Sequence, residues 1–140
     1  MSESRQILEH RFPARTDQLC ETRRLVREAL TELGCDSEYI EPMALAIDEA
    51  TANVLRHAYK GDESQDVLLE MYVDGDTLIT KLIDFAPPVD HSKIKPRDLE
   101  DIRPGGLGVH IIQEVMDSME YMHLDDRDGN VLVMKRKLPF

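Results

Sequence analysis

The alternation of hydrophobic and polar side chains near the start of the chain predicts a strand followed by a helix. Residues 5–15, RQILEHRFPAR, alternate with the period of two that is typical of a half-buried strand, and Pro13 closes the run. Thr16 or Asp17 is expected to cap the helix, because either side chain can accept a hydrogen bond from a backbone N–H group. Apolar residues then recur at helical spacing, and Gly34 marks the end of the helix.

A second helical region is predicted to follow and to reach about Tyr59. Asp36 or Ser37 is expected to cap its start, and Pro42 suits the first turn of its main helix. The glycine and polar residues directly after Tyr59 are typical of a helix exit. The apolar side chains that would face the core form one stripe: Met43, Ala46, Ile47, Ala50, Val54 and Ala58.

The second half of the chain predicts two hairpins, with a long loop and a helix between them. Residues 66–84 contain two strand-like runs joined by an Asp-Gly turn, and the second run ends at Asp84. Residues 86–105 are rich in proline and charge without clear periodicity, and loops of this length are often functional. Residues 105–119 are expected to open with glycines and then become a helix, and residues 119–138 are expected to form a closing hairpin.

The predicted order of elements therefore favours an α+β fold. It runs strand, helix, helix, strand, strand, loop, helix, strand, strand, which is too mixed for a regular parallel array. We expect a two-layer sandwich in which about three α-helices cover one face of a largely antiparallel or mixed β-sheet. The chain has 140 residues and shows no internal repeat, so a single domain over 1–140 is expected.

Composition narrows the classes of protein that fit this pattern. Hydrophobic residues are 41% of the chain and charged residues 32%, which excludes a disordered or membrane-embedded chain. The first residues, MSESRQILEHRF, lack the apolar segment of a signal peptide, so a cytoplasmic protein is expected. The net charge of −11 argues against nucleic acid as a direct partner, because neutralising phosphates needs a basic face.

Glu49 and Asn53 are the first candidates for chemistry. They lie four residues apart on the second helix, so both fall on one face at the edge of the apolar stripe. One interpretation is a solvated pair at a helix boundary. The other is a carboxylate and an amide oxygen facing a cleft, which suit a hard cation such as Mg²⁺ or a carboxylate base beside a metal ligand.

Two further features could belong to a site. Asp84 ends an apolar strand, where a carboxylate is either a turn residue or a functional group. Gly105, Gly106 and Gly108 precede a helix, and glycines there let backbone N–H groups approach a phosphate. The same cluster also fits a flexible entry to the helix.

The order of these features resembles the Bergerat-fold ATPases, which include gyrase, the heat-shock chaperone and sensor histidine kinases. DEATANVLRHAY at 48–59 resembles the first ATP box of that group, and DFAPPVD at 84–90 resembles the second. GGLGVHIIQEVMDSMEY at 105–121 resembles the third. Within the group, the chain looks most like the serine-kinase anti-sigma factors and their stand-alone relatives, over nearly its whole length.

The resemblance implies a role for each matching residue. Glu49 would be the general base, and Asn53 would hold Mg²⁺ through its amide oxygen. Asp84 would accept a hydrogen bond from the adenine amino group, and residues 86–105 would form a lid over ATP. The other implied ATP-binding residues are Ala86, Arg103, Gly105, Gly106, Leu107, Gly108 and Val109, with the helix starting at Val109.

The resemblance also implies an activity and partners. The protein would be an ATP- and Mg²⁺-dependent protein serine/threonine kinase that phosphorylates a small anti-sigma-antagonist protein of the STAS type. The resemblance also allows a sigma factor as a second partner, and it allows the protein to form a homodimer. The alternative is a non-catalytic ATP-sensing binding module. That alternative is favoured by Ala86, where the family usually has glycine, and by the lack of a threonine in GNVLV at 129–133.

Overall fold

The computed structural model describes residues 4–57, 65–85, 107–123 and 129–140. The elements in chain order are β1 Arg5–Pro13, the short 3-10 turn η1 Thr16–Gln18, α1 Leu19–Leu33, α2 Ser37–His57, β2 Asp66–Asp74, β3 Thr77–Asp84, α4 Leu107–Val115, β4 Ser118–His123 and β5 Asn130–Lys137. None of the helices in these ranges combines the length and the apolar character needed to cross a bilayer.

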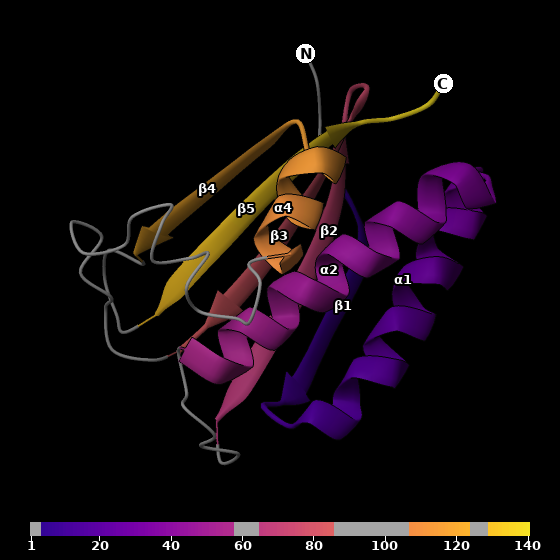
Figure 1. The fold of residues 1–140 in the computed structure, drawn as a ribbon. Helices are drawn as coiled ribbons and strands as arrows, with labels where there is room; N and C mark the ends of the chain where they lie inside the picture. The colour runs from indigo at the N-terminus through magenta and orange to yellow at the C-terminus, as the bar shows by residue number, and fades with distance from the viewer. Residues whose placement is uncertain (1–3, 58–64, 86–106, 124–128) are drawn as a thin grey trace.

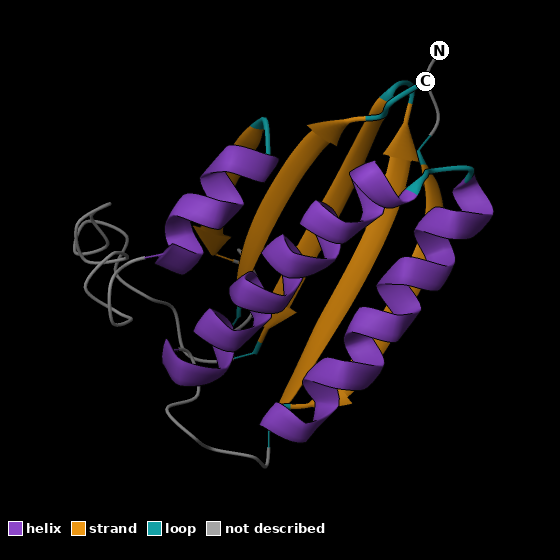
Figure 2. Ribbon diagram, turned by 45° about the vertical axis from the view of Figure 1, so that its right-hand side comes forward, coloured by secondary structure: helices purple, strands orange, loops and turns teal. Residues whose placement is uncertain are grey.

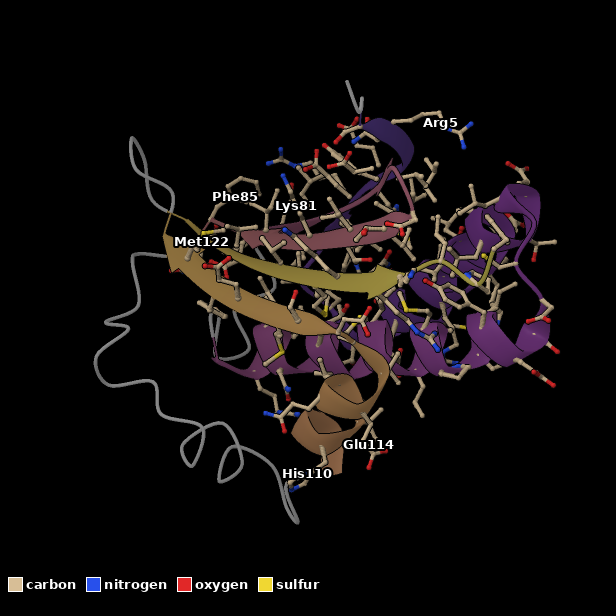
Figure 3. The ribbon with its side chains drawn as sticks, turned by 90° about the horizontal axis from the view of Figure 1, so that it is seen from above. Arg5, Lys81, Phe85, His110, Glu114 and Met122 are labelled. Carbon is tan, nitrogen blue, oxygen red and sulfur yellow. The ribbon has the colours of Figure 1, made fainter. Side chains whose placement is uncertain are left out.

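The five strands form one antiparallel sheet in the order β1-β2-β3-β5-β4. Helices α1, α2 and α4 lie on one face of this sheet, and α2 packs between the other two (Figures 1 and 2). Figure 3, in which the molecule is seen from above, shows Lys81 and Phe85 on the opposite face of the sheet. The predicted α+β sandwich with helices on one face is therefore confirmed.

The hydrophobic core fills the space between the sheet and the helices. Burial alternates strictly along β3, as expected for a strand with one covered face. The core includes strand residues Phe12, Val67, Leu69, Met71, Leu78, Leu82, Leu132 and Met134, and helix residues Val26, Leu30, Met43 and Ile47. Asp84 and Asn130 are buried polar residues at one end of the strands.

The predicted cap of the first helix is wrong. Residues Thr16–Gln18 wind as a 3-10 turn, and α1 begins at Leu19 after Gln18, which makes no side-chain cap hydrogen bond. The carboxylate of Asp17 instead accepts a hydrogen bond from Arg15 Nε at 3.1 Å. A local ion pair therefore occupies the side chain that was expected to cap the helix.

The start of α2 is confirmed for Asp36 but not for Pro42. Asp36 caps the helix, because its Oδ1 accepts a hydrogen bond from the Tyr39 backbone N–H at 3.2 Å. The helix is continuous from Ser37, so Pro42 lies inside it and beyond its first turn. The Asp36 cap therefore lies upstream of the proline, and the two predicted segments form one helix.

The third helix begins earlier and ends earlier than predicted. It begins at Leu107, two residues before the expected start at Val109, and it ends at Val115. The N–H of Met116 still bonds to a helix carbonyl, but the N–H of Asp117 already donates to Lys135 O at 2.8 Å. Pairing with β5 therefore ends the helix, and β4 starts at Ser118 rather than at Met119.

Candidate functional site

The predicted site residues come from elements that meet at one end of the molecule. The carboxyl end of α2, the end of β3 and the start of β5 all lie at this end (Figure 1). Helix α2 also contacts β3 and α4 directly. The end of the sheet and the carboxyl end of α2 therefore lie next to each other at this end of the molecule.

Glu49 and Asn53 occupy the position on α2 that the sequence predicts. The stripe residues from Met43 to Val54 are buried at 5% exposure or less, while Ala58 lies outside the described residues. Glu49 and Asn53 are both half-buried, which places them at the edge of this stripe and not on the solvent face. The helix thus presents a carboxylate and an amide, one turn apart, from the margin of the core.

Asn53 has a close cationic neighbour. Its Oδ1 accepts a hydrogen bond from Nη2 of Arg56, one turn further along α2, at 2.6 Å. Arg56 is exposed to solvent, so its guanidinium can leave this position without unpacking the core. The amide oxygen that was predicted as a metal ligand therefore lies beside a positive charge in this structure.

A salt bridge ties α1 to α2 next to Glu49. Arg23 of α1 donates from Nη2 to Asp48 Oδ1 at 3.1 Å. The side chain of Asp48 is only 22% exposed, so the ion pair is partly shielded from water. This contact fixes α2 against α1 at the turn that carries Glu49.

Asp84 is buried at 2% exposure at the end of β3, and its partner comes from β5. Asn130 lies directly opposite Asp84 in the antiparallel register and is itself fully buried. The Asn130 amide donates from Nδ2 to Asp84 Oδ1 at 3.0 Å. A turn residue would be expected at the surface, so this burial favours the functional interpretation of Asp84.

Sequence reasoning missed the part that Asn130 plays. The available signal was the alternation along β5, where Leu132 and Met134 face the core. Two residues earlier on the same face is Asn130, and the closing strand had to pair with a neighbour. The missing information was that the neighbour is β3, with Asp84 in register.

The whole of the predicted lid, residues 86–105, falls outside the described residues. Ala86, Arg103, Gly105 and Gly106 all lie outside them, and residues 107–109 form the first turn of α4. Gly108 therefore lies within a helix rather than before one, which corrects the expected start. Helix α4 packs against α2, so its first turn belongs to the same structural layer as Glu49 and Asn53.

The donor set of the described residues suits Mg²⁺ only together with a ligand that brings its own oxygens. No group of three His, Cys, Asp or Glu side chains in the described ranges could hold a metal ion. Mg²⁺ commonly keeps several waters and binds through one or two protein oxygens plus substrate phosphates. A single amide oxygen such as that of Asn53 fits this pattern.

Comparison with models of known protein families identifies the family to which the chain belongs. The profile of the histidine kinase-like ATPase domain matches residues 12–136. Because the match covers well over half of the sequence, the chain belongs to the family of histidine kinase-like ATPase domains. The resemblance drawn from the three motifs is confirmed, and ATP is the nucleotide that this family implies.

The curated relatives are serine-protein kinases named RsbW. The protein from Listeria innocua is 28% identical and covers 89% of this chain and 83% of its own length. The protein from Bacillus cereus strain Q1 is 29% identical, over 96% of this chain and 88% of its own length. RsbW of Bacillus pumilus is 29% identical over 86% and 80%, respectively. The expected similarity to the serine-kinase branch, and to a protein kinase in particular, is therefore confirmed.

A solved structure supports the fold. The structure of the RsbU and RsbW domains of Rv1364c from Mycobacterium tuberculosis matches with a TM-score of 0.66 at 18% identity. The match covers 94% of this chain but only 31% of that chain. It therefore shows the same fold for one part of a larger protein.

Proposed function

We propose that this protein is an ATP-dependent protein kinase that phosphorylates a serine or threonine of a small anti-sigma-antagonist protein of the STAS type. The observation that carries the proposal is the placement of Glu49 and Asn53 on α2. They lie half-buried, one turn apart, on the helix whose carboxyl end meets the buried Asp84 end of the sheet. The chain's membership of the histidine kinase-like ATPase family supports ATP as the phosphoryl donor.

The proposed chemistry is an in-line phosphoryl transfer. The substrate hydroxyl oxygen forms a bond to the γ-phosphorus, and the bond from that phosphorus to the β–γ bridging oxygen breaks, so ADP leaves with the electron pair. Glu49 takes the proton of the attacking hydroxyl as general base. A half-buried carboxylate can do this because it is accessible to substrate and still shielded from bulk water.

The remaining site residues bind the nucleotide. Asp84 accepts a hydrogen bond from the adenine amino group, and Asn53 holds Mg²⁺ through its amide oxygen. When bound, Mg²⁺ neutralises developing charge on the phosphate oxygens. The lid residues Ala86, Arg103, Gly105 and Gly106 and the start of α4, Leu107 to Val109, are proposed to surround the phosphates with backbone N–H groups.

The partners follow from the same proposal. The relatives carry the name serine-protein kinase, which supports a protein as the phosphoryl acceptor. A sigma factor is proposed as the second partner. A kinase of this kind needs cellular ATP, and this supports a cytoplasmic site of action.

The test is phosphoryl transfer by Glu49→Gln. Radiolabelled ATP is incubated with the protein and purified STAS-type proteins of the same organism, and label on each acceptor is measured. Glu49→Gln should abolish transfer and leave ATP affinity, measured by titration calorimetry, unchanged. Glu38→Gln is the matched control, because Glu38 is an exposed glutamate in the first turn of the same helix. Transfer at the original rate by Glu49→Gln would refute the base assignment.

The second candidate is a binding module that senses ATP without transferring phosphate. The specific observation in its favour is the hydrogen bond from Arg56 to Asn53 Oδ1, which engages the proposed metal ligand with a cation. Mg²⁺-dependent ATP binding by the wild type, with no label on any acceptor, would support this candidate over the kinase.

A further inference from the structure

The buried pair of Asp84 and Asn130 lies in an apolar setting. Asp84 ends β3, and Asn130 begins β5 directly opposite it, so both side chains leave the sheet on the same face. This is the helix-covered face, because Leu82 and Leu132, one pair further along the two strands, belong to the core. Val67 of β2 is the cross-strand neighbour of Asp84 on its other side.

Burial at this position makes the hydrogen bond consequential. Asp84 is 2% exposed and Asn130 is 0% exposed, so water cannot replace either partner cheaply. The bond from Asn130 Nδ2 to Asp84 Oδ1 is 3.0 Å long, which is an ordinary length for a made hydrogen bond. A buried carboxylate that lost this donor would be partly unsatisfied.

The chemistry of the two groups is asymmetric. An ionised carboxylate only accepts hydrogen bonds, whereas the Asn130 amide is neutral and donates here. A donor that is fixed on one oxygen restricts the rotation of the carboxylate and fixes the direction of its remaining lone pairs. Asp84 is thereby held as an acceptor toward any group that approaches it from the site.

We propose that Asn130 is a positioning residue that holds Asp84 as a hydrogen-bond acceptor and so makes the site prefer 6-amino purines over 6-oxo purines. The inference rests on the proposed function, in which Asp84 receives the adenine amino group. Adenine presents an N–H donor at position 6, whereas 6-oxo purines such as hypoxanthine present an acceptor there. A carboxylate fixed as an acceptor would meet that oxygen with repulsion.

A purely structural role for Asn130 makes a different prediction. If the amide only anchored the start of β5, its loss would lower the free energy of unfolding and weaken all nucleotides alike. A positioning role changes the preference between two nucleotides that differ only in the group at position 6. The ratio of ATP to ITP affinity therefore separates the two roles, because both ligands carry the same ribose and phosphates.

The experiment is titration calorimetry of ATP and ITP, with Mg²⁺, into the full chain and three variants. Asn130→Leu removes the donor, and Asn130→Thr retains a hydroxyl donor. Thr80→Val is the control, because Thr80 is a fully buried polar side chain on the same face of β3. Its hydroxyl has no hydrogen-bond partner among the residues that the structure describes.

We expect the wild type to prefer ATP, and Asn130→Leu to lose about tenfold in ATP affinity, as for one hydrogen bond to a charged group. ITP affinity should stay the same in that variant, so the ratio collapses. Asn130→Thr and Thr80→Val should retain the preference. A ratio in Asn130→Leu equal to that of the wild type would overturn the inference.

Two further outcomes are informative. A wild type that binds neither nucleotide refutes the proposed function itself. A wild type that binds both nucleotides equally refutes the recognition of the adenine amino group by Asp84. If Asn130→Leu does not fold, Asn130→Val replaces it, because a β-branched side chain suits a strand and has no hydrogen-bond donor. This variant should lose the preference for ATP, and a retained preference would overturn the inference.

Discussion

At the scale of single residues, the contact between Arg56 and Asn53 determines how readily a cation can reach the amide oxygen. The two side chains are joined at 2.6 Å, and the guanidinium is permanently charged. A divalent cation at the same oxygen would be repelled by that charge unless Arg56 turned away. The charge of Arg56 should therefore oppose the binding of Mg²⁺ to Asn53 when the Mg²⁺ concentration is low.

We expect Arg56→Gln to lower the Mg²⁺ concentration needed for ATP binding. The expected change is about two- to fivefold, because interactions between exposed charges are worth about 0.3–1 kcal/mol. The measurement is ATP affinity across a series of Mg²⁺ concentrations. Arg24→Gln is the control, since Arg24 is paired with Glu21 and Glu28 on α1. A higher Mg²⁺ requirement in Arg56→Gln would show that Arg56 assists binding instead.

The predictability of the site differs from residue to residue. Glu49 and Asn53 could be placed because helical spacing alone puts them at the edge of a buried stripe. Asn130 could not be paired with Asp84, because their contact depends on which strands become neighbours across 46 residues of chain. The contact of Arg56 with Asn53 is local, but the choice of rotamer is not encoded in the pattern of polar residues.

At the scale of elements, α2 determines how the site is held. Its buried stripe packs on the sheet, and its edges contact α1 and α4. Long-range ion pairs add to this, with Arg27 of α1 donating to Glu41 Oε1 at 2.8 Å. Both side chains are about half exposed, so this pair contributes little compared with the apolar stripe.

We expect Met43→Ala to lower the free energy of unfolding by about 2–5 kcal/mol, because it leaves a cavity in a fully buried site. Leu45→Ala is the matched control on the same helix, since Leu45 is 47% exposed and should change stability by less than about 0.5 kcal/mol. Chemical denaturation measures both. Equal losses in the two variants would contradict the assignment of the buried face.

The elements themselves could be predicted better than their ends. The two periodicities identified every strand and α-helix of the described structure in the correct order. The predicted start of α1 and the predicted end of α4 were wrong, because another contact engaged the group concerned, whereas the Asp36 cap of α2 was confirmed. The carboxylate of Asp17 accepts a hydrogen bond from Arg15. The N–H of Asp117 donates to the carbonyl of Lys135 on β5, and this contact ends α4. Neither competition is visible in hydrophobic spacing.

At the scale of the whole molecule, the two faces of the sheet differ in character. The covered face holds the core and the buried Asp84, whereas the open face carries charged and aromatic side chains (Figure 3). The guanidinium of Arg11 lies 4.9 Å from the ring centre of Phe85, and Lys81 Nζ lies 5.2 Å from that of Tyr72. These cation–π contacts cover aromatic rings that no helix covers.

His10 makes the stability of the fold depend on pH. It lies on the edge strand β1, stacked on Phe12 with ring centres 4.9 Å apart, and its Nε2 has no partner among the described residues. Burial lowers the pKa of His10, and the negative charge of Glu21 offsets this only in part. The folded protein therefore takes up a proton at His10 less readily than the unfolded chain, whose histidine pKa is about 6.5.

The sign of the effect follows from this difference. As pH falls through about 6.5, the unfolded chain binds a proton that the folded state resists, so the free energy of unfolding decreases. We expect this decrease in the wild type between about pH 7.5 and about pH 5.5, and a smaller one in His10→Gln. His110→Gln is the control, because His110 is exposed on α4.

The measurement is chemical denaturation of the three proteins across that pH range, with the slope of stability against pH as the readout. The slope is the informative quantity, because His10→Gln also changes packing against Phe12 and so shifts stability at every pH. Carboxylates titrate at lower pH and contribute equally to all three proteins. If His10→Gln retained the slope of the wild type, the lowered pKa of His10 would not be its cause.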